Sequence, residues 1–343
     1  MKMRNVYFVL GVLGVLMCCM FAAGCVSNEN SPGSAGVTIL QTDGSVFTLP
    51  HTAERIVLMN SNAAEMLYVI GAAGTVVGAS QSILDHAELG PLFPNAVSVG
   101  KWDVPDVELI SSLSPDVVIA FASSKPKNAD VIEAAGIPIV YIDCYKPSTM
   151  SQDVTALGIL TGNPEPAARF VTFYDGVMQD VAESVEKISM SPRVYCEGYT
   201  AYSAQVNGSG LDLLLDLANG RNVLMQDAGA TAPKVSPEWL VAENPDCIVK
   251  VVSVAKMSDP KGQFEELVSR TGFSSIDAVS QNRTWLIRND IAYGPRTFAG
   301  AVAVVKMLHP TVSEHLDVRA VLDAYNAQFG LNVSAGTLVY PEL

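Results

Sequence analysis

The chain has 343 residues, of which 49% are hydrophobic, so it is long enough to bury one large or two modest cores. Its 35 acidic residues outnumber 21 basic ones and give a net charge of −14. This excess of negative charge argues against nucleic acid as a partner and against binding to anionic lipid through surface charge. A solvated acidic surface is the simplest interpretation.

The first 25 residues have the pattern of an export signal. Two basic residues precede an uncharged apolar run over 6–23, and small residues then lead into Cys25. The Ala-Ala-Gly-Cys ending resembles the lipobox of lipoprotein signal peptides, in which the cysteine becomes the lipid-modified first residue. An uncleaved membrane anchor is the alternative, because an apolar run of this length can just span a bilayer. Either way we expect the body outside the cytoplasmic membrane, on a flexible tether formed by residues 26–36.

The segment 37–162 alternates strands and helices in the manner of a parallel α/β lobe. A hairpin with Asp43-Gly44 at its turn is expected first, and short connections then join the later elements. Two of the strands are β-branched and apolar enough to be buried on both faces. The expected strands are 55–60, 76–80, 116–121 and 137–143, and the expected helices are 61–71, 107–113, 128–135 and 148–160.

The segment 163–190 predicts one long helix that joins two lobes. Asn163 is placed to cap it, and Pro164 suits the first helical position, where no amide donor is needed. The helix should be about 35–40 Å long at 1.5 Å per residue. Apolar residues recur at steps of three and four, which is one stripe of a helix, at Phe170, Tyr174, Val177, Val181, Val185 and Ile188.

The segment 191–343 repeats the plan of the first lobe. The expected strands are 193–199, 247–253 and 284–289, and the expected helices are 210–220, 236–244, 296–308 and 318–329. The sequence therefore predicts an α/β fold with two parallel-sheet lobes bridged by one long α-helix.

An internal repeat supports two related lobes. Residues 107–121 align without a gap with residues 237–251, and Glu108 then matches Glu238 while a Pro-Asp pair matches a Pro-Asp pair. Each copy is a helix that begins with a carboxylate, a turn and a buried strand. Because any helix–turn–strand unit can look like another, the alignment alone does not exclude coincidence.

These stretches together resemble the cluster A, or class III, solute-binding proteins of ABC importers, the receptors for ferric siderophores, haem and cobalamin. The resemblance covers nearly all of the chain after its leader, and further motifs carry it: residues 55–80, GSGLDLLLDLANGRNV, GPRTFAG and a late LHP. It implies a monomeric receptor that delivers a small-molecule ligand to a permease dimer with its ATPase subunits. It also implies that Glu108 and Glu238 pair with arginines of that permease, as a two-fold partner requires. The alternative is that the two glutamates only stabilise their helix starts, for about 0.3–1 kcal/mol each.

The ligand of such a receptor should lie between the lobes, on loops at the carboxyl ends of the strands. An aromatic ring suits a flat macrocycle by stacking, and an arginine suits an anionic group. Trp102 occupies the place where cobalamin-binding relatives carry a stacking tryptophan. Ordinary packing is the alternative for each candidate. The expected ligand-binding residues are Asn60, Ser61, Gln81, Trp102, Tyr199, Tyr202 and Arg296.

No intrinsic cofactor and no resident metal is expected. The four histidines are scattered, and the three cysteines beyond residue 25 show no C-x-x-C spacing. The transported ligand is expected to be an iron chelate, cobalamin or haem. Haem receptors of this type can use tyrosine, which keeps Tyr199 and Tyr202 open as haem ligands, whereas Tyr145 and Tyr195 are weaker candidates.

Three other functions are alternatives to the receptor. An enzyme is disfavoured because the chain has no G-x-S-x-G, H-E-x-x-H, phosphate-loop or G-x-G-x-x-G motif. An outward-facing sensor would bind the same solute but signal instead of delivering it. A carrier of an oxyanion such as molybdate would keep the transporter class and change the cargo. A stiff connecting helix disfavours large hinge closure, so the cleft should be largely pre-formed.

Overall fold

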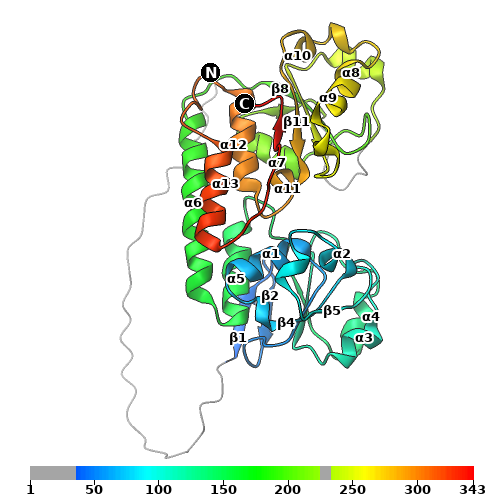
Figure 1. Cartoon of the computed structure of the whole chain (residues 1–343), viewed down its shortest axis with the longest axis vertical. Coiled ribbons are helices and arrows are strands. Elements are labelled where there is room, and N and C mark those ends of the chain that lie inside the picture. The colour runs from blue at the N-terminus through cyan, green and yellow to red at the C-terminus, as the bar shows by residue number, and fades with distance from the viewer. Residues whose placement is uncertain (1–35, 225–232) are drawn as a thin grey trace, which may run out of the picture. The chain divides into compact units, whose positions relative to one another are not determined.

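The computed structural model describes residues 36–224 and 233–343, so Cys25, the predicted signal peptide and nearly all of the predicted tether lie outside the described residues. The described chain folds into two α/β lobes joined by a long helix (Figure 1). The predicted fold class is confirmed. In the described ranges no helix is both long and apolar enough to cross a membrane.

The first lobe is built on a five-stranded parallel sheet in the order β5-β4-β3-β6-β7. An antiparallel hairpin of β1 (Val37–Leu40) and β2 (Val46–Leu49) precedes it, as expected from Asp43-Gly44. The sheet strands are β3 (Ile56–Leu58), β4 (Val76–Ala79), β5 (Val97–Ser98), β6 (Val117–Ala120) and β7 (Ile139–Tyr141). The helices are α1 (Ser61–Val69), α2 (Gln81–Leu84), α3 (Val107–Ser112), α4 (Ala129–Ala134) and α5 (Met150–Thr161).

The second lobe has a sheet in the order β12-β11-β10-β8-β9, in which only the edge strand β12 is antiparallel. Helix α9 was not predicted, because it is short and its apolar residues, Phe264, Leu267 and Val268, are confined to its second half. The strands are β8 (Arg193–Glu197), β9 (Arg221–Asn222), β10 (Cys247–Val252), β11 (Thr284–Arg288) and β12 (Val339–Tyr340). The helices are α7 (Gly210–Leu217), α8 (Pro237–Glu243), α9 (Pro260–Val268), α10 (Asp277–Ser280), α11 (Asn289–Ala292), α12 (Thr297–Leu308) and α13 (Val318–Phe329).

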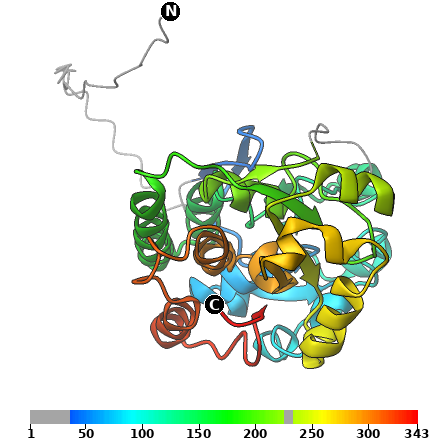
Figure 2. The same ribbon diagram turned by 90° about the horizontal axis from the view of Figure 1, so that it is seen from above.

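The connecting helix α6 spans Pro164–Val185, which makes it about 33 Å long at 1.5 Å per residue. It is shorter than predicted, so Ile188 lies beyond its end. Asn163 holds the cap position, but its side chain makes no capping bond and donates instead to the Thr161 carbonyl. The view from above in Figure 2 looks along this helix, which lies to one side of the lobes.

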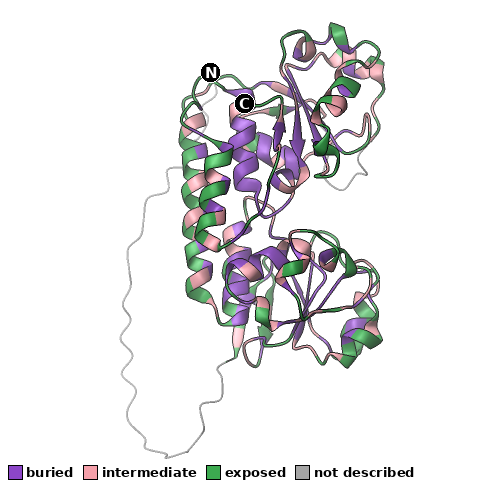
Figure 3. Cartoon of the chain, viewed as in Figure 1, coloured by how far each residue is buried: buried purple, intermediate pink, exposed green. Residues whose placement is uncertain are grey.

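The apolar stripe of α6 packs on helices of both lobes. Phe170, Tyr174 and Val181 are buried, and the rings of Phe170, Tyr174 and the neighbouring Phe173 join an aromatic cluster with α12 and α13. Figure 3 shows the consequence: α12 is buried almost throughout, whereas α6 keeps an exposed outer side. At the other end, Gly158 of α5 lets that helix approach α6, since an added Cβ would lie 2.5 Å from the Cβ of Ala167. The helix is thus a packed spine and not a free linker.

The internal repeat holds at the level of single hydrogen bonds. Asp116 accepts the Arg55 amide at 2.8 Å, and Asp246 accepts the Arg193 amide at 2.7 Å, just before or at the start of β3 and β8. Both arginine side chains donate to a backbone carbonyl at the C-terminal end of the repeat helix, that of Leu113 at the end of α3 and that of its repeat partner Glu243 at the end of α8. Ser114 and Asn244 both have a positive φ, of 46° and 44°. Because the two lobes share the same contacts as well as the same residue types at matching positions, the repeat is present in the structure and not only in the sequence.

Candidate functional site

A pocket of about 240 Å³ lies between the lobes and is lined by residues of both. Ser61 and Asn62 reach it from the start of α1, after the carboxyl end of β3, and Asn289 and Asp290 reach it from the end of β11. Carboxyl ends of parallel strands are where ligands bind in open α/β sheets. The volume is below the 300–1,000 Å³ usual for small-molecule sites. The pocket is therefore suited to hold one group of a larger ligand.

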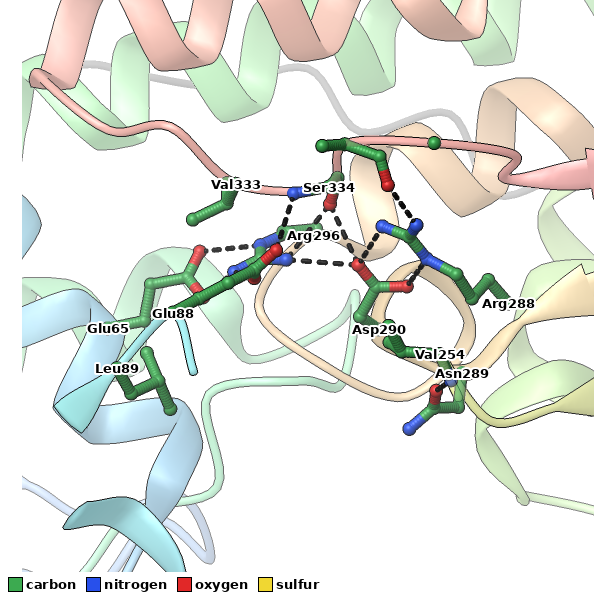
Figure 4. A network of polar contacts seen from close by, with 12 residues as sticks. Glu65, Glu88, Leu89, Val254, Arg288, Asn289, Asp290, Arg296, Val333 and Ser334 are labelled. Atoms are coloured by element: carbon green, nitrogen blue, oxygen red, sulfur yellow. Dashed lines mark hydrogen bonds and ion pairs between the residues drawn. The ribbon is translucent and has the colours of Figure 1, made fainter. Parts of the chain in front are cut away.

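Arg296 forms one wall of this pocket and joins the two lobes (Figure 4). Its guanidinium pairs with Glu65 of α1, where the contacts measure 3.0 and 2.8 Å, and with Glu88 at 2.9 Å. Asp290 and the Ser334 hydroxyl, both from the second lobe, accept its remaining donors at 3.0 and 2.9 Å. Four hydrogen bonds and the ion pair with Glu88 therefore engage all three guanidinium nitrogens.

Further contacts hold the carboxylates of this interlobe clasp, which we define as Glu65, Glu88, Asp290 and Arg296. The Tyr325 hydroxyl donates to Glu65 at 2.8 Å, and Arg288 donates to Asp290 at 2.7 and 2.8 Å. Glu88 also accepts the Ser334 amide at 3.0 Å. Burial opposes ionisation of Asp290, but Arg288 and Arg296 outweigh it and hold the pKa of that carboxyl below its usual range. Burial likewise opposes the charge of Arg296, and its carboxylate partners raise its pKa.

The ligand-binding role of Arg296 stays a prediction. The structure shows that its side chain is 3% exposed and is paired with carboxylates of both lobes, so it serves the contact between the lobes. The role of Asn60 in binding also stays a prediction: the residue is fully buried, caps α1 by accepting hydrogen bonds from the amides of Asn62 and Ala63, and donates to the Ile142 carbonyl. Asn60 follows a strand end and Arg296 immediately precedes α12, and both side chains make contacts within the fold.

Sequence reasoning missed Glu65, Glu88, Asp290 and Tyr325. Glu65 is the one charged residue of α1, and it lies among buried apolar neighbours. That position was the available signal, because a charge on the buried face of a helix requires a partner. Its partner is 231 residues further along the chain, which no local pattern indicates.

The other candidates of the first lobe keep accessible side chains. Ser61 is half-buried at the pocket, and Trp102 is half-buried after β5, with its ring edge-on to Phe121 at 6.1 Å. Gln81 is exposed at the start of α2 and exchanges hydrogen bonds with Ser98 and Asp85. Their roles in binding stay predictions.

The two tyrosines of the second lobe lie on one loop after β8. Tyr199 is 47% exposed, and its ring stands 6.0 Å from that of Tyr293, which lines the pocket. Burial raises the pKa of Tyr199 above its usual value. Tyr202 lies under the guanidinium of Arg270, 4.8 Å from the ring centroid. Tyr195 is buried within β8, and Tyr145 contributes its carbonyl to a bond with Thr297.

Glu108 and Glu238 occupy equivalent places. Each is exposed and is the second residue of its helix, α3 or α8, behind a cap formed by Asp106 or Ser236. In the described ranges neither takes part in an ion pair, and no group of residues is arranged to hold a metal ion. Cys144, Cys196 and Cys247 are buried free thiols, and burial raises the pKa of each.

Residues 56–291 match the periplasmic binding protein family, so the chain belongs to this family. A cobalamin-binding protein of Halobacterium salinarum is 29% identical over 233 residues, which are 64% of this chain and 60% of the relative's length. An uncharacterized ABC transporter substrate-binding lipoprotein of Bacillus subtilis, YvrC, is 23% identical over 86% of this chain and 95% of its own.

Solved structures show the same fold. The TroA-like periplasmic binding protein FepB of Veillonella parvula has a TM-score of 0.73 at 20% identity, covering 88% of this chain and 99% of its own. The molybdate-binding protein MolA of Haemophilus influenzae, solved with molybdate bound, has a TM-score of 0.67 at 18% identity, covering 85% and 97%. At these identities the likeness establishes the fold and not the ligand.

Proposed function

We propose that the chain is the extracytoplasmic substrate-binding protein of an ABC importer, anchored to the outer face of the cytoplasmic membrane through lipid on Cys25. It carries a metal chelate between its lobes, does no catalysis, and delivers its cargo to a permease dimer. The observation that carries the proposal is the structural repeat, which presents Glu108 and Glu238 at equivalent exposed positions of two like lobes. A two-fold permease requires such paired charges.

The cargo that the site favours is a neutral or cationic chelate, and a corrinoid is the first choice among the metal chelates. Glu65, Glu88 and Asp290 face the pocket, where Arg296 is the one cation among the lining residues. Such a wall repels an anion. The cobalamin-binding relative and the place of Trp102 support the corrinoid. Haem, with two carboxylates, and an oxyanion such as molybdate fit this wall less well.

A binding experiment tests the cargo. Cobalamin, haem, ferric siderophores and molybdate are titrated against intrinsic fluorescence, since Trp102, Trp239 and Trp285 are the only tryptophans. Cobalamin should quench the wild type strongly and a Trp102→Phe variant weakly. Trp285→Phe is the matched control, because this residue lies on β11 within the second lobe, and it should keep the quenching of Trp102. Equal quenching in both variants would remove Trp102 from the site.

An uptake experiment tests the docking role. Reversing Glu108 and Glu238 together to lysine should abolish import of the cargo and leave its affinity intact. Glu165→Lys is the matched control, since Glu165 is also an exposed second residue of a helix, but on α6. Its reversal causes the same loss at a helix start, about 0.3–1 kcal/mol, without touching the paired sites. Unchanged import by the double variant would refute the docking role.

A further inference from the structure

A buried ion triad lies beneath the loop that carries Tyr199 and Tyr202. Glu197 ends β8 and is fully buried, and it faces Lys250 in the register of the neighbouring strand β10. The Lys250 ammonium donates to one of its oxygens at 2.7 Å, and Arg270 donates to both oxygens at 2.7 and 3.0 Å. Arg270 lies just after the end of α9. An ion cluster inside a lobe needs a reason, because burying charge is unfavourable unless it is compensated.

The triad bonds directly to the aromatic loop, defined here as residues 198–204. The Tyr202 amide donates to Glu197 at 2.9 Å, and Lys250 donates to the Gly198 carbonyl at 3.0 Å. Glu197 and Lys250 thus hold two points of the loop backbone, one at its start and one near its end. Within the loop, the Gly198 amide donates to the Ser203 carbonyl at 2.8 Å and closes it.

The loop conformation requires this support. Tyr202 has φ of 64°, which is unfavourable for a residue with a side chain by roughly 1–2 kcal/mol. Its ring contacts the Arg270 guanidinium, 4.8 Å from the ring centroid, and lies edge-on to Phe273 with 6.1 Å between the centroids. A strained backbone persists only where its surroundings determine it, and such strain is concentrated at binding sites. Tyr199, whose ring is 47% exposed, belongs to the same loop.

The charge of the triad also departs from balance, since two cations share one carboxylate. Burial opposes ionisation of Glu197, but Arg270 and Lys250 lower its pKa, so the carboxylate stays charged. Burial, helped by Arg270, lowers the pKa of Lys250. A fold that needed only a neutral core here would be served by one cation. Each cation also contacts the aromatic loop: Lys250 donates to the Gly198 carbonyl, and Arg270 lies over the Tyr202 ring.

We propose that Glu197, Lys250 and Arg270 are positioning residues that fix the aromatic loop and thereby set the affinity for cargo. The proposal rests on the proposed function, because it takes the loop to face the cargo. Lys250 sets the start of the loop through Gly198, and Arg270 sets the ring of Tyr202. Glu197 holds both cations and the Tyr202 amide. None of the three needs to touch the cargo.

Two variants test the proposal, Lys250→Met and Arg270→Met. Each leaves one cation with one carboxylate, a balanced pair, so each should fold. Arg193→Met is the matched control. It removes a cation from the start of β8, the strand that ends at Glu197, and so lies away from the aromatic loop. The readouts are hydrogen exchange of residues 198–204 in the free protein, exchange of β10 as a reference, and the Kd for cyanocobalamin. Glu197→Gln, which leaves two cations without a carboxylate, should disturb folding and is not used to decide.

The expected result is faster exchange in the loop by on the order of tenfold in both variants, with β10 unchanged, and a Kd weakened by a similar factor. A purely structural role would instead raise exchange throughout the lobe, and that result would overturn the proposal. Unchanged loop exchange would overturn it too, as would a loosened loop that binds cyanocobalamin as tightly as before. If the wild type binds no compound of the panel, the proposed function fails, and loop exchange alone decides whether the triad holds the loop.

Discussion

The interlobe clasp yields a quantitative prediction through Arg296→Met. Methionine keeps a long apolar stem and removes the guanidinium, so Glu65, Glu88 and Asp290 lose their common partner. Glu65 keeps the Tyr325 hydroxyl, and Asp290 keeps Arg288. Glu65 is therefore the carboxylate that the substitution leaves buried without a cation.

Removing one partner of a buried ion pair lowers stability by about 3–5 kcal/mol, because the remaining charge stays desolvated. Glu65 is 3% exposed, so the full effect applies to it. Against a total stability of about 5–15 kcal/mol, this loss is large. Glu65→Gln should lower stability less, since Arg296 then retains Glu88 and Asp290. Adding Glu65→Gln to Arg296→Met should restore part of the loss, as neighbouring residues are not additive.

Urea unfolding of the four proteins, followed by circular dichroism, measures these differences. Lys127→Met is the matched control: its ion pair with Asp103 is also 2.8 Å long, but the lysine side chain is 72% exposed. Exposed pairs contribute about 0–1 kcal/mol. The reasoning is refuted if Arg296→Met loses no more than Lys127→Met, or if the double variant is less stable than Arg296→Met alone.

Two further predictions concern the spine and a buried carboxyl. Gly158→Ala should lower stability by about 1–3 kcal/mol through overpacking against Ala167. Gly176 lies on the exposed side of α6 with open space around it, so Gly176→Ala should raise the stability by about 0.5–1 kcal/mol in the same urea assay. Burial raises the pKa of Asp153 from 3.8 to about 6, so between these values the folded chain holds a proton that the unfolded chain has released. Stability should therefore fall by roughly 3 kcal/mol as pH rises through that window, and in urea titrations Asp153→Asn should remove this part of the fall.

Patterns confined to one element predicted the fold well. The stripe from Phe170 to Val185 predicts α6 because a helix that packs along two lobes must bury one continuous face. The repeat at Glu108 and Glu238 predicts equivalent helices because the same local contacts close each unit. The end of α6 was misplaced because Ile188 continues the period in sequence after the chain has left the helix.

The candidate site was harder to predict, because its residues depend on partners far apart in the chain. Arg296 stands where a ligand-binding arginine would stand, and only the fold brings Glu65, Glu88 and Asp290 around it. Asn60 at a strand end was equally ambiguous, since an amide there can bind a ligand or cap the next helix. Neither choice follows from the residue type.

Two separate attachments restrict how the lobes can move. The aromatic cluster around Phe173 fixes α12 and α13 to the spine, and the clasp ties α1 to Arg296 at a second place. A single attachment would allow rotation about it, whereas two attachments oppose both bending and twisting. If the chain delivers cargo as proposed, Glu108 and Glu238 then keep nearly the same separation in the loaded and the empty protein. The permease must therefore distinguish the loaded from the empty protein by the loops that lie between Glu108 and Glu238. Among the clasp carboxylates, Glu88 is the most accessible, at 25% exposure, and lies on such a loop, so cargo contacts would change this part of the clasp first.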